Sequence, residues 1–296
     1  MTTAPFGELI TAMVTPYDSC GEVDYGKAAE LALHLSGNGS DGLVISGTTG
    51  ESPALSRDEK IQLFKSVVAA VKGKVKILAG TGGNYTHQSI ELTKLAGECG
   101  VDGIMLVVPY YNKPSQDALL HHFSTIAGAV ELPVMLYNVP GRTGVNMTAE
   151  TTLRLAEIDN IAAVKEASGS LDQVSQICAK APPGFAVYSG DDSLTLPIMA
   201  VGGVGVVSVA SHVAGREIKN MITAYAQGNV ATARNIHLRL LPLYNAMFIT
   251  SNPVPVKSAM NLLGHELGSV RGPLIALNEK EKDIITRVMT ELGFLS

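Results

Sequence analysis

The chain has 296 residues, a length typical of two domains or of one large barrel. Hydrophobic residues make up 46% of the chain and charged residues 17%, so a sizeable core is available and wholesale disorder is excluded. With 22 basic and 27 acidic side chains the net charge is −5, which argues against a nucleic-acid or anionic-membrane surface, because both need a concentrated positive field.

No membrane-spanning or targeting segment is visible in the sequence. Apolar runs such as 104–108 (IMLVV) are far shorter than the roughly 20 residues that a spanning helix needs. The N-terminal residues MTTAPFGELI have neither a basic start nor a long apolar segment. Cys20, Cys99 and Cys178 are widely spaced and form no CxxC pair, which is typical of reduced thiols. We therefore expect a cytoplasmic protein.

Eight short apolar runs recur in the first 210 positions. Most lack polar alternation, which is typical of strands buried on both faces of a parallel sheet. Their starts lie about 24–33 residues apart for most of the chain and closer together near the end. The predicted strands are 9–14, 42–46, 75–79, 103–108, 133–137, 161–165, 185–189 and 204–209.

Segments of helical periodicity lie between these runs. Ser56 and Glu59 form a capping-box pattern at the start of one helix, and Gly73 marks its end. The other predicted N-caps are Thr86, Ser115 and Ser170, the last in a second capping box with Gln173. Eight strand–helix units at this spacing predict a closed (β/α)8 barrel of the α/β class, with an open doubly wound sheet as the alternative.

Strand-like runs disappear after about residue 228. The periodicity there predicts helices over 229–248, 254–263 and 279–292, separated by prolines and glycines. We expect residues 1–228 to form the catalytic barrel and residues 229–296 to form a C-terminal helical domain. No low-complexity linker divides the two, so the helices are expected to pack on the barrel.

Polar side chains follow several of the predicted strands. In a (β/α)8 barrel the active site lies at the carboxyl ends of the strands, so these side chains are expected to share one site. They are Thr48 and Thr49 in GTTGE, Tyr110 and Tyr111 in PYYNKP, Tyr137 and Arg142 in YNVPGRTG, Lys165 in AVKEASG, and the SGDD turn at 189–192.

Lys165 is the predicted nucleophile. It follows Ile-Ala-Ala-Val, a run expected to be buried inside the barrel. A buried ammonium is costly, so this lysine should either pair with a charge or lose its proton. The neutral amine would condense with a ketone to form a Schiff base. The alternative is a lysine that pairs with Glu166 or lies at an exposed strand end.

Three hydroxyl groups could serve such an amine. Forming and dehydrating a carbinolamine requires protons to be delivered and removed, and Tyr137, Tyr111 and Thr48 could form a proton chain for this purpose. The alternative for each tyrosine is ordinary core packing with a satisfied hydroxyl.

Two further features could bind carboxylates. The GTTGE turn offers backbone N–H groups and the Thr49 hydroxyl, although such a segment is often only a turn. Arg142 could bind a second carboxylate through a bidentate pair, unless it is a plain surface arginine.

Signals for metals and phosphates are weak. The seven histidines show no HExxH or other ligand spacing, so no metal site is expected. Asp191 and Asp192 could hold a divalent ion, but a structural turn is favoured. The glycines at 202–205 could bind a phosphate or a flavin, yet they precede an apolar strand and no full GxGxxG or GxxxxGK[ST] follows.

Six segments together resemble the dihydrodipicolinate synthases, a family of pyruvate-dependent class I aldolases. Their order and spacing fit that family over essentially the whole chain. They are GTTGE at 47–51, PYYNKP at 109–114, YNVPGRTG at 137–144, VKEASG at 164–169, SGDD at 189–192 and NPVPVK at 252–257.

The resemblance implies a lyase that condenses pyruvate with L-aspartate 4-semialdehyde in lysine and diaminopimelate biosynthesis. It implies that Lys165 forms the Schiff base and that Tyr137 donates and accepts protons. Thr48 joins Tyr137 in this role, as does Tyr111, which the family supplies across a subunit interface. No cofactor or catalytic metal is implied, because the enamine on lysine is itself a carbanion equivalent.

The resemblance also implies the binding residues and the assembly. Thr49 and the backbone of Val207 would hold the pyruvate carboxylate, Arg142 would bind the carboxylate of the aldehyde, and the Gly190 carbonyl would line the pocket. Members of the family usually form a homotetramer, built as a dimer of dimers.

One departure from the family concerns feedback control. Members that lysine inhibits place histidine or glutamate near the dimer interface, where this chain has Arg57, Lys60 and Gln88. Ser52, Asn84 and Tyr110 fit the pattern. Two added cations and one lost anion should repel a cationic ligand, so we expect weak inhibition by lysine.

Other functions remain open from the sequence alone. N-acetylneuraminate lyases and sugar-acid aldolases share the lysine and the tyrosine, but their polyhydroxylated substrates would not require Arg142 in PGRTG. A phosphate- or flavin-binding barrel would use the glycines at 202–205. A non-catalytic sensor would have little need to keep Lys165, Tyr137 and Thr48 together.

Overall fold

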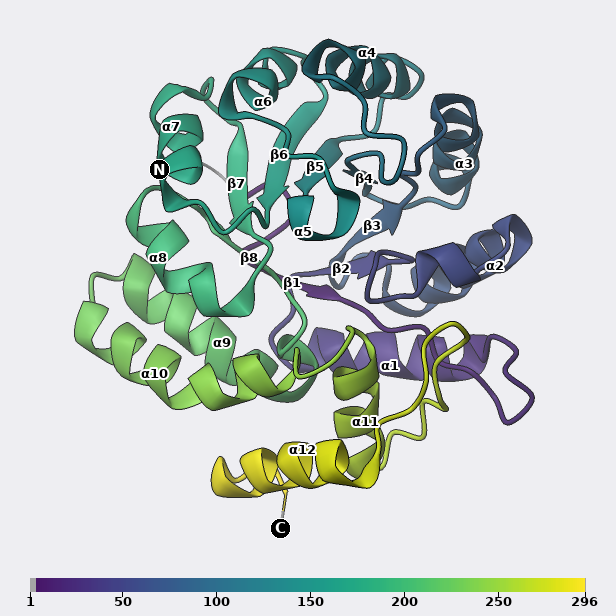
Figure 1. Cartoon of the computed structure of the whole chain (residues 1–296), viewed down its shortest axis with the longest axis vertical. Coiled ribbons are helices and arrows are strands. Elements are labelled where there is room, and N and C mark those ends of the chain that lie inside the picture. The colour runs from purple at the N-terminus through teal and green to yellow at the C-terminus, as the bar shows by residue number, and fades with distance from the viewer. Residues whose placement is uncertain (1–3, 296) are drawn as a thin grey trace.

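The computed structural model describes residues 4–295 and contains a closed barrel of eight parallel strands. Residues 1–3 of the N-terminal segment and Ser296 of the predicted C-terminal domain lie outside this range. Each strand pairs with the next along the chain, and β1 also pairs with β8, which closes the sheet (Figure 1). The predicted (β/α)8 barrel is therefore confirmed, and the open sheet is excluded.

All eight predicted strands are confirmed, with bounds that differ by at most two residues at either end. They are β1 (Leu9–Ala12), β2 (Gly42–Ile45), β3 (Lys76–Gly80), β4 (Gly103–Val107), β5 (Val134–Asn138), β6 (Ile161–Glu166), β7 (Ala186–Ser189) and β8 (Gly205–Ser208).

Helices surround the barrel, and short additional turns lie over its rim (Figure 1). The barrel helices are α1 (Tyr25–Gly37), α2 (Arg57–Val71), α3 (Thr86–Glu98), α4 (Gln116–Ala127), α6 (Ala149–Ala156), α7 (Leu171–Lys180), α8 (Thr195–Ala200) and α9 (Ser211–Ala226). The rim carries α5 (Pro140–Thr143) and the two 3-10 turns η1 (Ser52–Ala54) and η2 (Asp192–Leu194).

The predicted helix starts are mostly correct. Ser56 and Glu59 make both hydrogen bonds of a capping box at the start of α2, and Ser115 caps α4. Ser170 caps α7 by accepting a hydrogen bond from the backbone N–H of Gln173. The second capping box is wrong, however, because the Gln173 side chain donates to other partners away from the helix start.

The predicted N-cap at Thr86 is wrong. Thr86 is the first residue of α3, and Tyr85 precedes it without a side-chain capping bond. The Thr86 hydroxyl instead lies 2.9 Å from Nδ1 of His122 on α4. A partner on the neighbouring helix, which the local sequence does not reveal, takes the place of the cap.

The interior of the barrel is filled by side chains that alternate along the strands with those facing the helices. Both faces of the sheet are buried, which explains why the strands lack polar alternation. The interior cluster includes Ile10, Val44, Leu78, Met105, Met135, Tyr137, Ala163, Ala186 and Val207.

The three predicted C-terminal helices are present as α10 (Val230–Ala246), α11 (Val254–Leu262) and α12 (Glu279–Glu291). Leu240, Met260 and Ile285 on these helices belong to the same apolar core as residues of the barrel, so they pack on it as expected. The domain boundary between 228 and 229 stays a prediction. Within residues 4–295, no helix is both long and apolar enough to cross a membrane.

A buried ion pair joins α11 to the barrel rim. Nζ of Lys257 lies 3.1 Å from Oε1 of Glu51, the last residue of GTTGE, and both side chains are 2% exposed. Lys257 also donates to the carbonyl of Ser269 and lies 3.9 Å from the centroid of the Tyr17 ring. The backbone N–H of Arg271 donates to Oε2 of Glu51 at 2.9 Å. This pair holds the loop after β2 in place.

Replacing Lys257 should strongly destabilise the fold. In Lys257→Met the Glu51 carboxylate stays buried without its cation, so we expect the free energy of unfolding to fall by about 3–5 kcal/mol. Urea titration followed by circular dichroism measures this change. Adding Glu51→Gln should recover part of the loss, because the uncompensated charge is then gone.

The matched control is Lys282→Met, which breaks the exposed pair between Lys282 and Glu279 on α12. It should cost about 0.5 kcal/mol or less. Equal losses in Lys257→Met and Lys282→Met would contradict a special role for the buried pair.

Candidate active site

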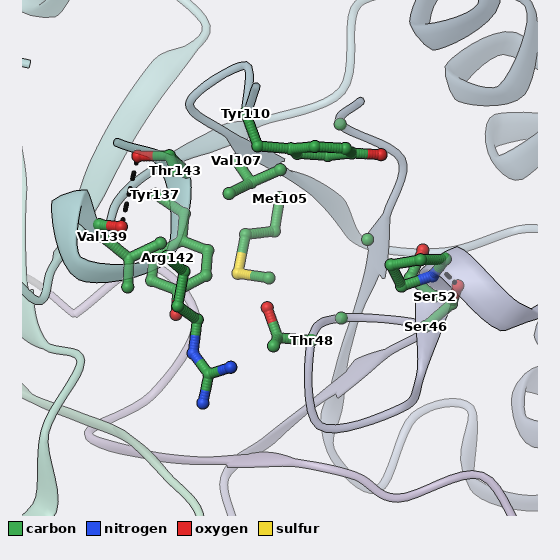
Figure 2. Close-up of a pocket in the computed structure, with 14 residues that line it drawn as sticks. Ser46, Thr48, Ser52, Met105, Val107, Tyr110, Tyr137, Val139, Arg142 and Thr143 are labelled. Atoms are coloured by element: carbon green, nitrogen blue, oxygen red, sulfur yellow. Dashed lines mark hydrogen bonds between the residues drawn. The ribbon is translucent and has the colours of Figure 1, made fainter. Parts of the chain in front are cut away.

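A cavity of about 250 Å³ opens at the carboxyl ends of the strands (Figure 2). Thr48, Tyr137 and Arg142 face it from the loop after β2, from β5 and from α5, as the sequence predicts. Its other lining residues are Ser46, Gly47, Ser52, Pro53, Gly80, Gly82, Met105, Val107, Tyr110, Val139 and Thr143.

Lys165 and Tyr137 meet because β5 and β6 are in register at these two residues. The Lys165 side chain is inside the barrel and only 5% exposed, and its Nζ lies 4.1 Å from the centroid of the Tyr137 ring. Lys165 is not itself part of the cavity wall; Tyr137 is. The predicted buried lysine is thus next to the predicted tyrosine.

The alternative roles for Lys165 are wrong. Glu166 follows it on the strand and therefore points to the opposite face, where it accepts hydrogen bonds from Asn138, Ser168 and Gln173. Within residues 4–295, no carboxylate forms a salt bridge with Lys165. A buried lysine without a paired carboxylate is better accommodated as a neutral amine.

Burial lowers the pKa of Lys165 to about 7. The buried Asp192 carboxylate raises this pKa, and the positive charge of Arg142 lowers it further. Asp192 is itself held by hydrogen bonds from the Ser208 hydroxyl and from the backbone N–H groups of Val209 and Ala210. A large fraction of the amine is therefore neutral near neutral pH.

Tyr137 is a phenol rather than a phenolate at neutral pH. Burial raises the pKa of Tyr137, while the charge of Arg142 and the nearby Thr48 hydroxyl lower it in part. Thr48 and Tyr137 thus line the same cavity from the loop after β2 and from β5. This arrangement can hold a proton beside the Lys165 amine and pass it on.

Tyr111 is not brought into the cavity. Its side chain is 88% exposed, and its backbone has a φ of 76°. Its neighbour Tyr110 lines the cavity instead. Of the three predicted hydroxyl groups, therefore, Tyr137 and Thr48 line the cavity within residues 4–295 of one chain and Tyr111 does not.

Gly190 lies against the Lys165 side chain, and Val207 lies in the barrel interior. A Cβ at Gly190 would be 2.7 Å from the Cβ of Ala167 and 3.2 Å from Cε of Lys165, so only glycine fits there. Val207 on β8 belongs to the same interior cluster as Tyr137.

Thr49 is buried and has a partner that the sequence analysis missed. Nδ2 of Asn252 donates to the Thr49 hydroxyl oxygen at 2.8 Å, and Oδ1 of Asn252 is buried without a partner. With its oxygen accepting from Asn252, the Thr49 hydroxyl keeps its own hydrogen to donate elsewhere. Asn252 is the first residue of the NPVPVK segment. That segment was recognised as a family motif, but its sequence alone did not indicate a contact with Thr49.

The glycines at 202–205 form no phosphate site. A Cβ at Gly203 would be 2.4 Å from the Ile198 side chain, and one at Gly205 would be 1.9 Å from the carbonyl oxygen of Glu8. Gly203 and Gly205 are therefore needed for close packing, which accounts for these glycines without a bound anion. The favoured structural role of the SGDD turn is confirmed, because Asp191 caps η2 and Asp192 caps the end of β8.

Comparison with known proteins agrees with this geometry. Residues 5–292 match the model of the dihydrodipicolinate synthetase family. A 4-hydroxy-tetrahydrodipicolinate synthase of Cyanothece sp. is 55% identical over 291 residues, covering 98% of this chain and 99% of that protein.

Two solved structures are also similar. A dihydrodipicolinate synthase of Cyanidioschyzon merolae, with lysine bound, is 49% identical with a TM-score of 0.98 and covers 99% of this chain and 100% of that one. A dihydrodipicolinate synthase of Acinetobacter baumannii, complexed with pyruvate, is 36% identical with a TM-score of 0.95 and covers 98% of this chain and 100% of that one.

The match extends over almost the entire chain and includes the barrel, the C-terminal helices and the strand ends that carry Lys165, Tyr137 and Thr48. The chain therefore belongs to the dihydrodipicolinate synthetase family.

Proposed function

We propose that this chain catalyses the condensation of pyruvate with L-aspartate 4-semialdehyde, the first committed step of lysine and diaminopimelate biosynthesis. The observation that carries the proposal is Lys165, a buried lysine without a paired carboxylate whose Nζ lies 4.1 Å from the centroid of the Tyr137 ring. The relatives named as 4-hydroxy-tetrahydrodipicolinate synthases support it over nearly their full length.

The Lys165 amine attacks the keto carbon of pyruvate to form a carbinolamine. Tyr137, which lines the cavity together with Thr48, protonates the departing hydroxyl, which leaves as water and gives the Schiff base. Loss of a proton from the methyl carbon then gives an enamine, whose electron pair forms the new carbon–carbon bond with the aldehyde. The amine of the second substrate displaces Lys165 during cyclisation, which frees the enzyme.

Two carboxylates orient the substrates. The Thr49 hydroxyl, whose oxygen is already engaged by Asn252, donates to the pyruvate carboxylate together with the backbone of Val207. The Gly190 carbonyl lines the pyruvate site. Arg142 binds the carboxylate of the semialdehyde from the other side of the cavity.

Tyr111 acts from a second copy of the chain in this proposal. Its 88% exposed side chain is free to enter a neighbouring subunit, where it would extend the proton chain of Tyr137 and Thr48. The working assembly is a homotetramer built as a dimer of dimers. We place the enzyme in the cytoplasm, in keeping with Cys20, Cys99 and Cys178, which are all free.

Trapping with borohydride tests the function. Incubation with pyruvate and borohydride should add one three-carbon adduct, and peptide mass spectrometry should locate it on Lys165. Lys165→Ala should form no adduct and should lose about a thousandfold or more of the condensation activity, while its far-ultraviolet circular dichroism stays unchanged. Retained activity in Lys165→Ala would refute the mechanism but not the fold.

The rate of pyruvate capture should depend on pH through the lowered pKa of Lys165. The protonated amine has no free electron pair, so the rate should fall about tenfold per pH unit below the pKa of about 7 and level off above it. Single-turnover adduct formation with cyanoborohydride measures this profile, with reduction of a small imine as the control. A rate that keeps rising toward the ordinary lysine pKa of about 10.4 would contradict it.

Inhibition by lysine should be weak. Arg57 is exposed and Lys60 is half-buried in the first turn of α2, so the start of this helix carries two basic side chains. Activity in millimolar lysine should change by less than about twofold.

A variant with the opposite change in charge at these three positions is the control for the predicted weak inhibition by lysine. The triple variant Arg57→His, Lys60→His and Gln88→Glu should become more sensitive to lysine, because it removes two cations and adds an anion. Strong inhibition of the unmodified enzyme would refute the charge argument.

A further inference from the structure

The residues that follow Tyr137 and Lys165 in the sequence form a second pair behind the barrel wall. The register of β5 and β6 sets Tyr137 beside Lys165 and Asn138 beside Glu166. Successive side chains of a strand point to opposite faces, so the first pair lies inside the barrel and the second outside it. Asn138 is 0% exposed and Glu166 is 1% exposed. The two pairs share the same stretch of backbone.

Glu166 is a buried carboxylate held by neutral donors. Nδ2 of Asn138 lies 3.1 Å from both of its oxygens, the backbone N–H of Ser168 donates at 2.7 Å, and Nε2 of Gln173 donates at 2.9 Å. Within residues 4–295, no lysine or arginine forms a salt bridge with it. A buried carboxylate without a cation is stabilised only by its hydrogen-bond donors, so the loss of any one donor is costly. Asn138 is the donor from the neighbouring strand.

Asn138 also closes the segment that carries Arg142. Its Oδ1 accepts a hydrogen bond from the backbone N–H of Met147 at 3.0 Å, and its Nδ2 donates to Oδ1 of Asn146 at 2.8 Å. The residues between Asn138 and Met147 include α5, from which Arg142 reaches the cavity. One amide thus contacts both the neighbour of Lys165 and the far end of the Arg142 segment.

We propose that Asn138 and Glu166 are positioning residues for the condensation. From outside the barrel they hold Lys165 against Tyr137, and Asn138 additionally holds the segment that presents Arg142. Neither residue touches the substrates. This inference rests on the function proposed above. Its physical basis is that a displacement of about 1 Å between reacting groups can lower a rate about a hundredfold.

Three variants test the pair. Asn138→Asp places a second carboxylate against Glu166, where two anions repel each other. Glu166→Gln removes the charge but keeps the shape of the side chain. The double variant Asn138→Asp/Glu166→Gln restores one carboxylate and one amide with their positions exchanged.

The rate of adduct formation and the KM for aspartate semialdehyde should respond differently to these variants. Asn138→Asp should slow adduct formation at saturating pyruvate about tenfold or more. It should also raise the KM for aspartate semialdehyde, because Asp keeps the acceptor for the Met147 N–H but loses the amide that donates to Oδ1 of Asn146 in the Arg142 segment. Glu166→Gln should slow adduct formation with a smaller change in that KM. The double variant should recover adduct formation to within about threefold of the unmodified enzyme.

Asn160→Asp is the matched control. Asn160 precedes β6 at its opposite end, where its amide donates to the carbonyls of Ala127 and Val130, each at 2.9 Å. This variant should lower the thermal midpoint but leave the rate of adduct formation per folded molecule unchanged. If Asn138 and Glu166 were purely structural, their variants would also lower the thermal midpoint without changing the rate of adduct formation per folded molecule.

The outcomes separate the two proposals. If the unmodified enzyme forms no adduct, the proposed function fails. If the unmodified enzyme does form the adduct, two results would overturn the positioning role. One is that folded Asn138→Asp and Glu166→Gln form the adduct as fast as the unmodified enzyme. The other is that the double variant is no faster than Asn138→Asp. Should Asn138→Asp not fold, Glu166→Gln decides the question, since its rate must then lie below that of the unmodified enzyme.

Discussion

The chemistry of this protein depends on the cost of burying one ammonium group. Closure of the barrel removes water from Lys165, and no carboxylate within residues 4–295 forms a salt bridge with it to offset the loss of hydration. The same burial keeps Tyr137 protonated, so one constraint produces a free amine and an acid beside it. Gly190 contributes by leaving space against the lysine stem. These properties follow from the apolar interior of the barrel rather than from a dedicated charged partner.

Buried polar contacts hold the loops of the site in place. The pair of Lys257 and Glu51 fixes the loop after β2 from the C-terminal helices, and Asn252 contacts Thr49 from the same direction. On the other side, Asn138 joins β5, β6 and the segment of α5. The C-terminal helices are therefore part of the machinery that shapes the rim, although they contribute no side chain to the cavity wall.

The sequence was sufficient for the barrel and for the residues at its rim. Unbroken apolar runs such as 103–108 identify strands buried on both sides, and polar residues directly after such runs must lie at one rim, as Thr48, Tyr137 and Arg142 do. The burial of Lys165 followed from the run before it. Each of these patterns is local in the sequence, and the closed barrel then brings the residues concerned to one rim.

Contacts between distant segments could not be predicted in this way. Thr86 has the composition of an N-cap, yet its hydroxyl faces His122 on the next helix. Asn252 and Thr49 are about 200 positions apart, and no periodicity links them. Tyr111 was expected in the proton chain, but a single chain leaves it on the surface.

The closed segment between Asn138 and Met147 has a consequence for the evolution of this barrel. Its ends are tied to each other by side-chain and backbone hydrogen bonds, so the residues within it can vary while the strand that supports the amine stays where it is. In the proposed reaction Lys165 on β6 would capture the keto acid, and Arg142 in this segment would bind its electrophilic partner. A related enzyme could therefore accept a different aldehyde through substitutions in this one short loop.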